Sequence, residues 1–246
     1  MNVEEKEPPG ILKKTIADFL QEEKRGFRLL QVLGIPTRGN EHKTLMEVCT
    51  VENRNEEEIL KEIKQLKKGT EFDYPDGIFS WSTELVIRYL KEEHHDYTIS
   101  LIQNADDYGA RAWDVHGAQY PKINQVNWYV QKLKKKLEMH LSFENQKYFP
   151  NVLRFFQMNG EPKDGMVQSL KKQTEIVEKD QQDIEYFTQR IRDLTNNFTP
   201  PKEACTTFRL FYLTLQKLDQ DLKKHHFLEH QYVLSKLKMK LDNLLI

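Results

Sequence analysis

The chain contains 246 residues, of which 30% are charged and only 10 are glycine. Long solvated helices suit this composition better than sheets, and the length allows one large domain, or a medium domain with a small one. The formal net charge of -1 gives no case for nucleic-acid binding, because the lysines of residues 132–136 are interrupted by Leu133 and balanced by nearby glutamates.

The cysteines and the apolar segments narrow the class of protein further. Cys49 and Cys205 lie far apart and form neither a disulfide framework nor a cysteine-rich metal site. The acidic first ten residues lack the apolar stretch of a signal peptide, and no apolar run approaches the ~18 residues of a membrane span. We therefore expect a protein of the reducing cytoplasm that does not act at a membrane.

The first predicted unit is a small helical domain over roughly residues 11–68. Apolar residues recur at helical spacing over residues 15–33, and the Gly-Ile-Pro sequence at residues 34–36 ends that helix. After a loop around residues 38–40, Asn55 is expected to cap a further helix. Its first turn carries three glutamates, whose charge complements the helix dipole.

A linker at residues 67–77 leads to the second predicted domain, residues 80–246. Four long helices are expected there, over residues 82–108, 123–158, 165–195 and 202–244. Pro150 predicts a kink near the end of the second helix. Helices of this length joined by loops predict an all-α fold built around an up-down four-helix bundle, which can seat a metal site between its helices.

Two His-x-x-x-Glu pairs mark the second and fourth predicted helices: His140 with Glu144, and His225 with Glu229. Residues four apart share one face of a helix, so each pair can direct an imidazole and a carboxylate at one ion. These donors suit iron, manganese or zinc, and carboxylates of bundle cores can bridge two cations. One such pair alone is typical of a helix surface, whereas two pairs on two long helices favour a metal site.

Each pair also continues an apolar stripe of its helix. Leucines lie three and seven residues before each histidine: Leu133 and Leu137 before His140, and Leu218 and Leu222 before His225. This pattern directs both pairs toward the core, where a charged carboxylate needs compensation that a metal supplies. Spacing and composition by themselves leave a metal site and ordinary packing equally open. His94 adjoins His95, and His226 adjoins His225. Each is expected to point about 100° away from its neighbour on the helix.

Several segments resemble the iron–sulfur cluster repair di-iron family, also called RIC proteins. The most specific is NNFTPPKEACTT at residues 196–207. Residues 137–150 are similar to the second-helix motif of that family, residues 93–96 to its first-helix motif, and residues 115–117 to the turn after the first helix. Residues 34–45 have the length and ends of its N-terminal motif. The resemblance therefore covers nearly the whole chain.

The resemblance implies a hemerythrin-like bundle that holds two non-haem irons bridged by carboxylates. Carried over position by position, it makes His95, His140 and His225 terminal ligands and Glu144 and Glu229 the bridges. It also implies a role in stress response: the repair of iron–sulfur clusters that nitric oxide or oxidants have damaged. The implied partners are damaged iron–sulfur proteins, and related N-terminal domains suggest a homodimer by analogy.

The chain departs from the family pattern at two places. A vicinal Cys-Cys in the N-terminal motif is replaced by Arg38 and Gly39, which puts thiol chemistry there in doubt. In the third helix, the position of a ligand histidine is occupied by Gln181, and residues 141–224 contain no histidine. Gln181 offers a neutral carbonyl oxygen, and Asp180 is either an anionic substitute ligand or a solvated side chain.

Three states of the metal site remain open on this sequence: two irons with one position left to water, a single metal, or the loss of tight binding. The residues favour the first two, because five of the six ligand types remain. A repair protein or iron donor is expected rather than a classical enzyme, and no nucleotide-binding or hydrolase motif occurs. The alternatives are a hemerythrin-like protein that binds or senses oxygen or nitric oxide, and a relative that has partly lost its metal site.

Overall fold

The computed structural model describes residues 10–23, 26, 29–30, 35–51, 59–60, 63, 78–158, 162 and 164–242. Two predictions lie outside these residues: the cap at Asn55 with its acidic first turn, and the linker at residues 67–77. Over the described residues the chain is helical and has no strand, only an isolated bridge between Thr15 and Thr44. The all-α prediction is confirmed.

Among its described residues, the N-terminal part has two short helices, α1 (Ile16–Glu22) and α3 (Leu45–Val51). Thr15 caps α1, since its side chain accepts a hydrogen bond from the backbone N–H of Asp18. The prediction of one continuous helix over residues 15–33 is wrong. Glu23 adopts an extended backbone (φ -95°, ψ 110°) and ends α1, and its N–H donates to the carbonyl of Phe19.

A loop at residues 35–44 fastens this N-terminal part to the long helices. The guanidinium of Arg111 contacts the buried carboxylate of Glu41 at 2.6 Å, and Arg38 Nε lies 2.9 Å from Asp107 Oδ1. Gly39 has a positive φ of 75°, a conformation that glycine adopts without strain, and its N–H donates to Glu41 Oε1. The two residues that replace a Cys-Cys pair therefore serve this attachment.

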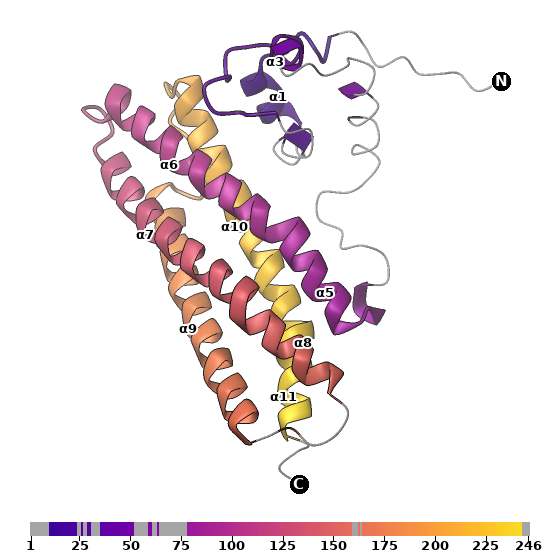
Figure 1. The fold of residues 1–246 in the computed structure, drawn as a ribbon. Helices are drawn as coiled ribbons and strands as arrows, with labels where there is room; N and C mark the ends of the chain where they lie inside the picture. The colour runs from indigo at the N-terminus through magenta and orange to yellow at the C-terminus, as the bar shows by residue number, and fades with distance from the viewer. Residues whose placement is uncertain are drawn as a thin grey trace, which may run out of the picture.

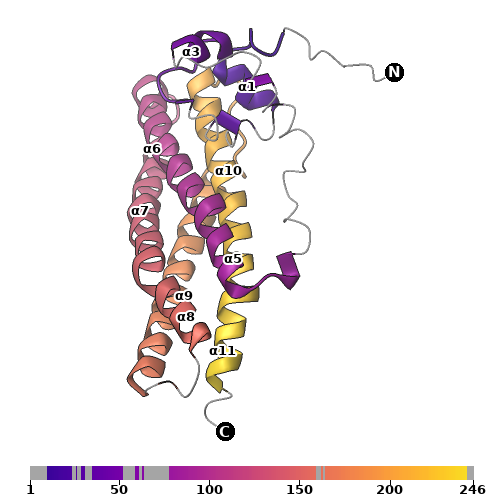
Figure 2. The ribbon, with the colours of Figure 1, turned by 45° about the vertical axis from the view of Figure 1, so that its right-hand side comes forward.

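Four long helical rods lie side by side, and helices α1 and α3 lie at their upper end, as both views show (Figures 1 and 2). Their bounds, in chain order, are η1 (Ile78–Ser80), α5 (Thr83–Tyr89), η2 (Leu90–His95) and α6 (Asp96–His116) in the first; α7 (Lys122–Phe143), η3 (Glu144–Tyr148) and α8 (Phe149–Gln157) in the second; α9 (Asp164–Leu194) in the third; and α10 (Thr206–Leu228), η4 (Glu229–Leu234) and α11 (Ser235–Asp242) in the fourth. Helix α6 packs against α7 and α10, and α7 packs against α9.

Three boundaries differ from the predicted ones. The first rod runs to His116 rather than Tyr108, because its buried stripe continues through Ala112 until Gly117. The α-helix of the second rod is interrupted by η3, just before Pro150, which lies in the first turn of α8. The fourth rod begins at Thr206, since the residues before it include two prolines and an extended Cys205.

Two apolar clusters fill the molecule, and a polar layer separates them along the rods. The upper cluster joins the N-terminal part to the bundle and includes Leu101, Leu133, Leu137, Ile184 and Leu222. The lower cluster includes Leu90, Val152, Val177, Leu228 and Leu237. Between them in sequence, on all four rods, lie buried polar residues: His94, His95, His140, Glu144, Gln181, His225 and Glu229.

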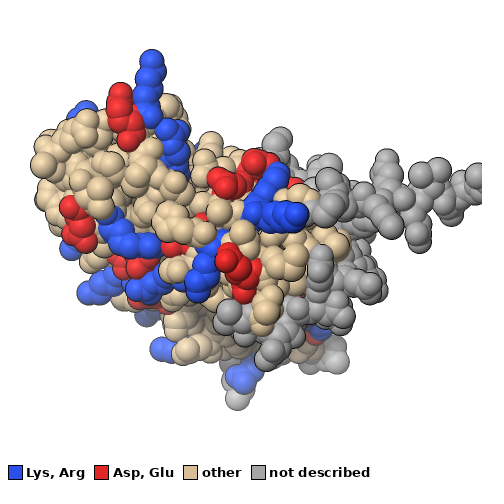
Figure 3. Space-filling model, turned by 90° about the horizontal axis from the view of Figure 1, so that it is seen from above, with Lys and Arg blue, Asp and Glu red and all other residues tan. Residues whose placement is uncertain are grey.

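The face at the N-terminal end of the described part is mixed in charge. Seen from above, the face at the N-terminal end carries Lys and Arg interspersed with Asp and Glu (Figure 3). Among the helices that the structure describes, none is long and apolar enough to cross a membrane.

Candidate metal centre

Three of the four rods carry a π-helical turn at the level of the polar layer. η2 ends at His95, η3 begins at Glu144, and η4 begins at Glu229. A π turn accommodates one extra residue and shifts the faces of the helix, and such turns are frequent at functional sites. Both His94 and His95 are buried, but His94 contacts Asp221 and is in neither candidate ligand group.

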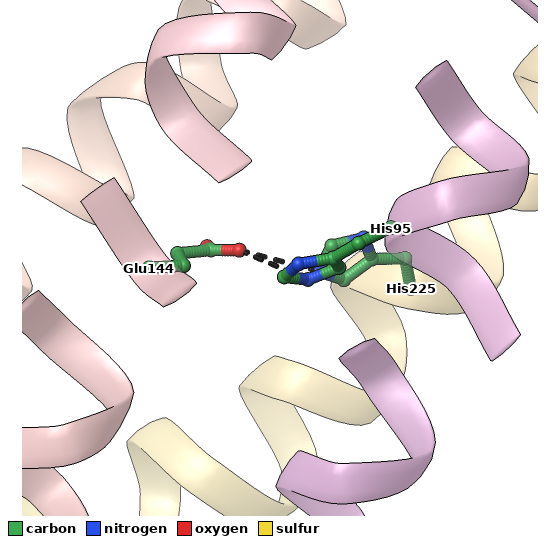
Figure 4. Close-up of side chains that lie close together, drawn as sticks. All are labelled: His95, Glu144 and His225. Atoms are coloured by element: carbon green, nitrogen blue, oxygen red, sulfur yellow. Dashed lines mark ion pairs between the residues drawn. The ribbon is translucent and has the colours of Figure 1, made fainter. Parts of the chain in front are cut away.

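The first candidate ligand group consists of His95, Glu144 and His225, all of them buried. Nε2 of His95 lies 3.3 Å from Oε2 of Glu144, and Nε2 of His225 lies 3.7 Å from the same oxygen. Figure 4 shows both imidazole rings pointing toward this carboxylate from other helices. The two rings stack with their centroids 4.9 Å apart.

The second candidate group consists of His140, Glu144 and Glu229, which are also buried. Nε2 of His140 lies 2.9 Å from Oε1 of Glu144. The carboxylate of Glu229 reaches the same region from the fourth rod, where its Oε2 lies 3.8 Å from Nε2 of His225.

Glu144 therefore belongs to both groups and divides its two oxygens between them. Oε2 faces His95 and His225, whereas Oε1 faces His140. A carboxylate with this arrangement can link two cations, as inward-facing glutamates do in di-iron bundle proteins. The structure thus brings together all five residues that the sequence predicts as metal ligands.

The donor atoms of these groups fit a metal because imidazole nitrogens and carboxylate oxygens converge at ion-pair distances. Among the described residues, no hydrogen-bond partner is present for the following buried atoms: Nε2 of His95, His140 and His225, both carboxylate oxygens of Glu144, and Oε1 of Glu229. Each unsatisfied buried polar atom costs about 1–3 kcal/mol, more when the group is charged. A cation bound between nitrogen and oxygen donors would satisfy these atoms together.

Burial and neighbouring charges shift the pKa values of the carboxylates of Glu144 and Glu229 in opposite directions. Burial alone would raise the pKa of Glu144, but the positive charge of His140 brings that pKa well below its ordinary value. Burial raises the pKa of Glu229 well above its ordinary value, and the negative charge of Glu144 raises it further.

The pKa values of the two histidines that face Glu144 from α7 and α10, His140 and His225, are shifted in opposite directions. Burial lowers the pKa of His140, but the nearby charge of Glu144 outweighs it and raises the pKa to about 10. Burial dominates at His225 and lowers its pKa well below the usual range. His225 is therefore already neutral, as a metal ligand must be, whereas His140 has to release a proton.

Gln181 points into the centre from α9. It is 5% exposed, and its Nε2 donates a hydrogen bond to Oε2 of Glu229 at 2.5 Å. Its neighbour Asp180 accepts a hydrogen bond from Lys136 at 2.9 Å and lies 3.8 Å from Nδ1 of His140. Asp180 thus stands behind the imidazole of His140 and is in neither ligand group.

Sequence reasoning missed the polar partners that hold the imidazoles. Nδ1 of His95 donates to Oδ1 of Asn145 at 3.0 Å, which leaves Nε2 free to accept a metal bond. His94 Nδ1 lies 2.8 Å from Oδ1 of Asp221, whose other oxygen accepts from Thr98. The available signals were that Asn145 adjoins Glu144 and that Asp221 lies four residues before His225.

Fold and site together define an all-α bundle protein with a buried histidine and glutamate centre of the kind that holds metal ions. No family model matches the chain. It is similar to the iron-sulfur cluster repair protein ScdA of Staphylococcus epidermidis, with 24% identity over 155 residues, 63% of this chain and 66% of that protein. ScdA of Staphylococcus haemolyticus is 25% identical over 154 residues, 61% of this chain and 65% of that protein.

A second kind of relative comes from enterobacteria. The iron-sulfur cluster repair protein YtfE of Escherichia coli is 27% identical over 146 residues, 59% of this chain and 60% of that protein. The matched segments thus span less than two thirds of the length of these relatives. The similarities support the assignment of this chain to the iron–sulfur cluster repair family that its motifs resemble.

Proposed function

We propose that this chain is a hemerythrin-like non-haem iron protein that takes part in the repair of iron–sulfur clusters damaged by nitrosative or oxidative stress. The observation that carries the proposal is the division of Glu144 between two buried ligand groups whose donor atoms have no other partner. The names of the relatives supply the physiological direction, since they are iron-sulfur cluster repair proteins.

Two irons would share Glu144 and otherwise be held by different donors. His95, His225 and Glu144 would hold one ion, and His140, Glu144 and Glu229 would hold the other, with Gln181 beside the second. Bound ferrous iron would supply an exchangeable metal and an affinity for diatomic molecules such as nitric oxide or oxygen. The buried position of these donors lets the bundle exclude bulk water from the ions.

The surrounding residues orient the donors. Asn145 fixes the His95 ring through Nδ1, and Asp180 lies behind the His140 ring. Such contacts set the direction of the ligating nitrogen and raise its basicity. The apolar clusters above and below the layer pack the four rods together and so hold the ligands near one another.

The partners and setting follow from the same proposal. The acceptors of iron would be iron–sulfur proteins that have lost part of their cluster, and the protein would work in the cytoplasm. A homodimer through the N-terminal part also stays a prediction, as does the division into domains at residues 11–68 and 80–246. On this proposal the protein is a metal donor rather than an enzyme with a turnover of its own.

A repair assay with purified components tests the proposal. A [4Fe–4S] dehydratase is inactivated with nitric oxide, and its recovery is followed after adding the ferrous-loaded chain, an equal amount of free ferrous iron, or a loaded Glu138→Gln variant. Glu138 is an exposed residue of α7 outside the centre. We expect recovery faster than with free iron for the wild type and for Glu138→Gln, and none beyond free iron for Glu144→Gln. Recovery no faster than with free iron would contradict the proposal, and reversible oxygen binding without recovery would favour a sensor or store.

A further inference from the structure

A groove between α9 and the end of the fourth rod's α10 leads toward the metal centre. Its volume is about 380 Å³. The residues that line it are Glu178, Gln181, Gln182, Glu185, His226 and His230. The four α9 residues recur at spacings of three and four, so they form one face of that helix. This face is polar along its length, unlike the stripes that α9 buries in the core.

Gln181 connects the groove to the centre. It lines the groove, yet it is more than nine-tenths buried and bonds through Nε2 to Oε2 of Glu229. Its Oε1 has no hydrogen-bond partner among the described residues, and neither has Nε2 of His226 in the same wall. One amide side chain thus separates a solvent-filled groove from a ligand of the second group.

The groove is lined by two carboxylates, each held by an ion pair, and only the pair of Glu178 is exposed on both sides. Oε1 of Glu178 lies 2.6 Å from Nζ of Lys238, and Oε1 of Glu185 lies 2.8 Å from Nη2 of Arg192. The side chains of Glu178 and Glu185 are 30% and 54% exposed. An exposed pair such as Glu178 with Lys238 contributes little to stability, so a divalent cation can displace the lysine from this carboxylate. Arg192 is only 12% exposed and also pairs with Asp219, so at Glu185 the cation would bind beside the arginine.

The other half of the centre lies behind aromatic rings instead. His95 stacks between His225 and Phe149, with centroids 4.9 Å and 5.8 Å away. Phe149 belongs to the lower apolar cluster. A hydrated cation meets polar oxygen and nitrogen atoms on the Gln181 side and a hydrocarbon ring on the Phe149 side.

We propose that the groove is a cation-accepting site through which divalent metal enters and leaves the centre, with the Gln181 amide passing the ion to Glu229. The inference rests on the metal centre of the proposed function. Glu178 and Glu185 attract the hydrated ion, and the unpartnered oxygen of Gln181 replaces a water of its shell. Since an amide carries no charge, it holds the ion weakly and lets it pass in either direction.

Uptake of Co²⁺ by the metal-free full-length chain tests this route, because Co²⁺ gains visible absorption when imidazole and carboxylate bind it. We expect Glu178→Gln/Glu185→Gln to slow uptake by about tenfold at low salt, with the difference shrinking at high salt. Gln181→Leu, which keeps the volume but removes the polar atoms, should slow both uptake and release by chelator. Thermal unfolding of each metal-free variant checks that the fold is intact.

Glu138→Gln/Glu175→Gln is the matched control, since it removes the same charge from exposed positions outside the groove. It should take up Co²⁺ at the wild-type rate. Equal rates for the groove variants and the wild type would overturn the route while leaving the repair proposal standing. Failure of the wild type to bind Co²⁺ would overturn both, and slow uptake by the variants without cluster repair by the wild type would overturn the repair role alone.

Discussion

The two halves of the metal centre share Glu144 but differ in every other donor. The first half adds two imidazoles, from His95 and His225, and lies against an aromatic ring. The second half adds one imidazole, from His140, and one carboxylate, from Glu229, and it borders a polar groove through Gln181.

Because of this difference, we expect the first half to hold its metal tightly and the second half to exchange its metal. Two imidazoles and a carboxylate, with Asn145 orienting one ring, make a set of donors that holds an ion tightly. In the second half, an ion has to displace a proton from His140 and finds an amide where a second imidazole would bind. We therefore expect unequal affinities, with the exchangeable ion on the Gln181 side.

The largest expected effect comes from Glu144, because both halves depend on it. Glu144→Gln keeps the shape of the side chain and removes its charge, so both binding steps should weaken by more than about 100-fold. Chelator competition followed by metal quantification measures this, with Glu138→Gln as a control of equal charge change. Retention of one tightly held ion by Glu144→Gln would show that the halves do not share this residue.

Removing one imidazole at a time separates the halves. His95→Ala should abolish the tighter step and His140→Ala the weaker one, each leaving the other ion within about tenfold of its wild-type affinity. Titration of each variant with Co²⁺ follows both steps. If either substitution removed both ions, the halves would form one inseparable site.

Gln181→His tests whether the missing imidazole makes the second half weak. An imidazole at this position should raise the affinity of the weaker step by about tenfold, since second-half donors would then match those of a closed site. Gln189→His, which adds a histidine at an exposed position of α9, is the control and should change neither step. If the affinity of the weaker step were unchanged in Gln181→His, a feature other than the missing imidazole would limit that affinity.

The residues behind the imidazoles should give smaller effects, each confined to its own half. Asn145→Ala removes the acceptor of His95 Nδ1, and Asp180→Asn removes the charge that lies 3.8 Å from His140 Nδ1. Each should weaken its own step by about tenfold and leave the other unchanged. Equal losses in both steps would point to a general loosening of the bundle, which thermal unfolding would reveal.

The halves should also respond oppositely to pH when the metal is absent. The pKa of His140 is raised from 6.5 to about 10, so the folded state binds more protons than the unfolded state between these values. Its stabilisation is complete below pH 6.5 and is lost as the pH rises to about 10. The pKa of His225 is lowered, so its contribution has the opposite sign and stability falls as the pH drops below 6.5.

Urea unfolding of the metal-free chain from pH 5 to 10 measures this difference. His140→Gln should reduce the loss of stability on the alkaline side, and His225→Gln should reduce the loss on the acid side. Parallel curves for both variants would contradict the charge distribution described for the centre.

The sequence predicted the features of the metal centre that depend on helical spacing. It did not predict the π-helical turns, each of which depends on a single inserted residue. Periodicity placed the four rods, and the two His-x-x-x-Glu pairs placed four of the gathered residues. The π turns leave no mark in an apolar pattern, because one extra residue only shifts the faces of a helix. The burial of His94 and its pairing with Asp221 followed from that shift and were not foreseen.

Other features depend on contacts between distant segments. Gln181 was recognised as a departure from the family pattern, but its bond to Glu229 required the placement of α9 against the fourth rod. The groove likewise depends on the packing of two distant segments, since Glu178 and Glu185 lie on α9 and His226 lies on α10. The end of α1 at Glu23 is a local backbone change that side-chain spacing could not indicate.

The most direct test of the central claim is an anaerobic titration of the metal-free wild-type chain with ferrous iron, followed by quantification of the bound metal. We expect two irons per chain that bind in two unequal steps, the weaker of which strengthens in Gln181→His. Fewer than about one tightly held iron per chain, or two equal steps unaffected by Gln181→His, would contradict it.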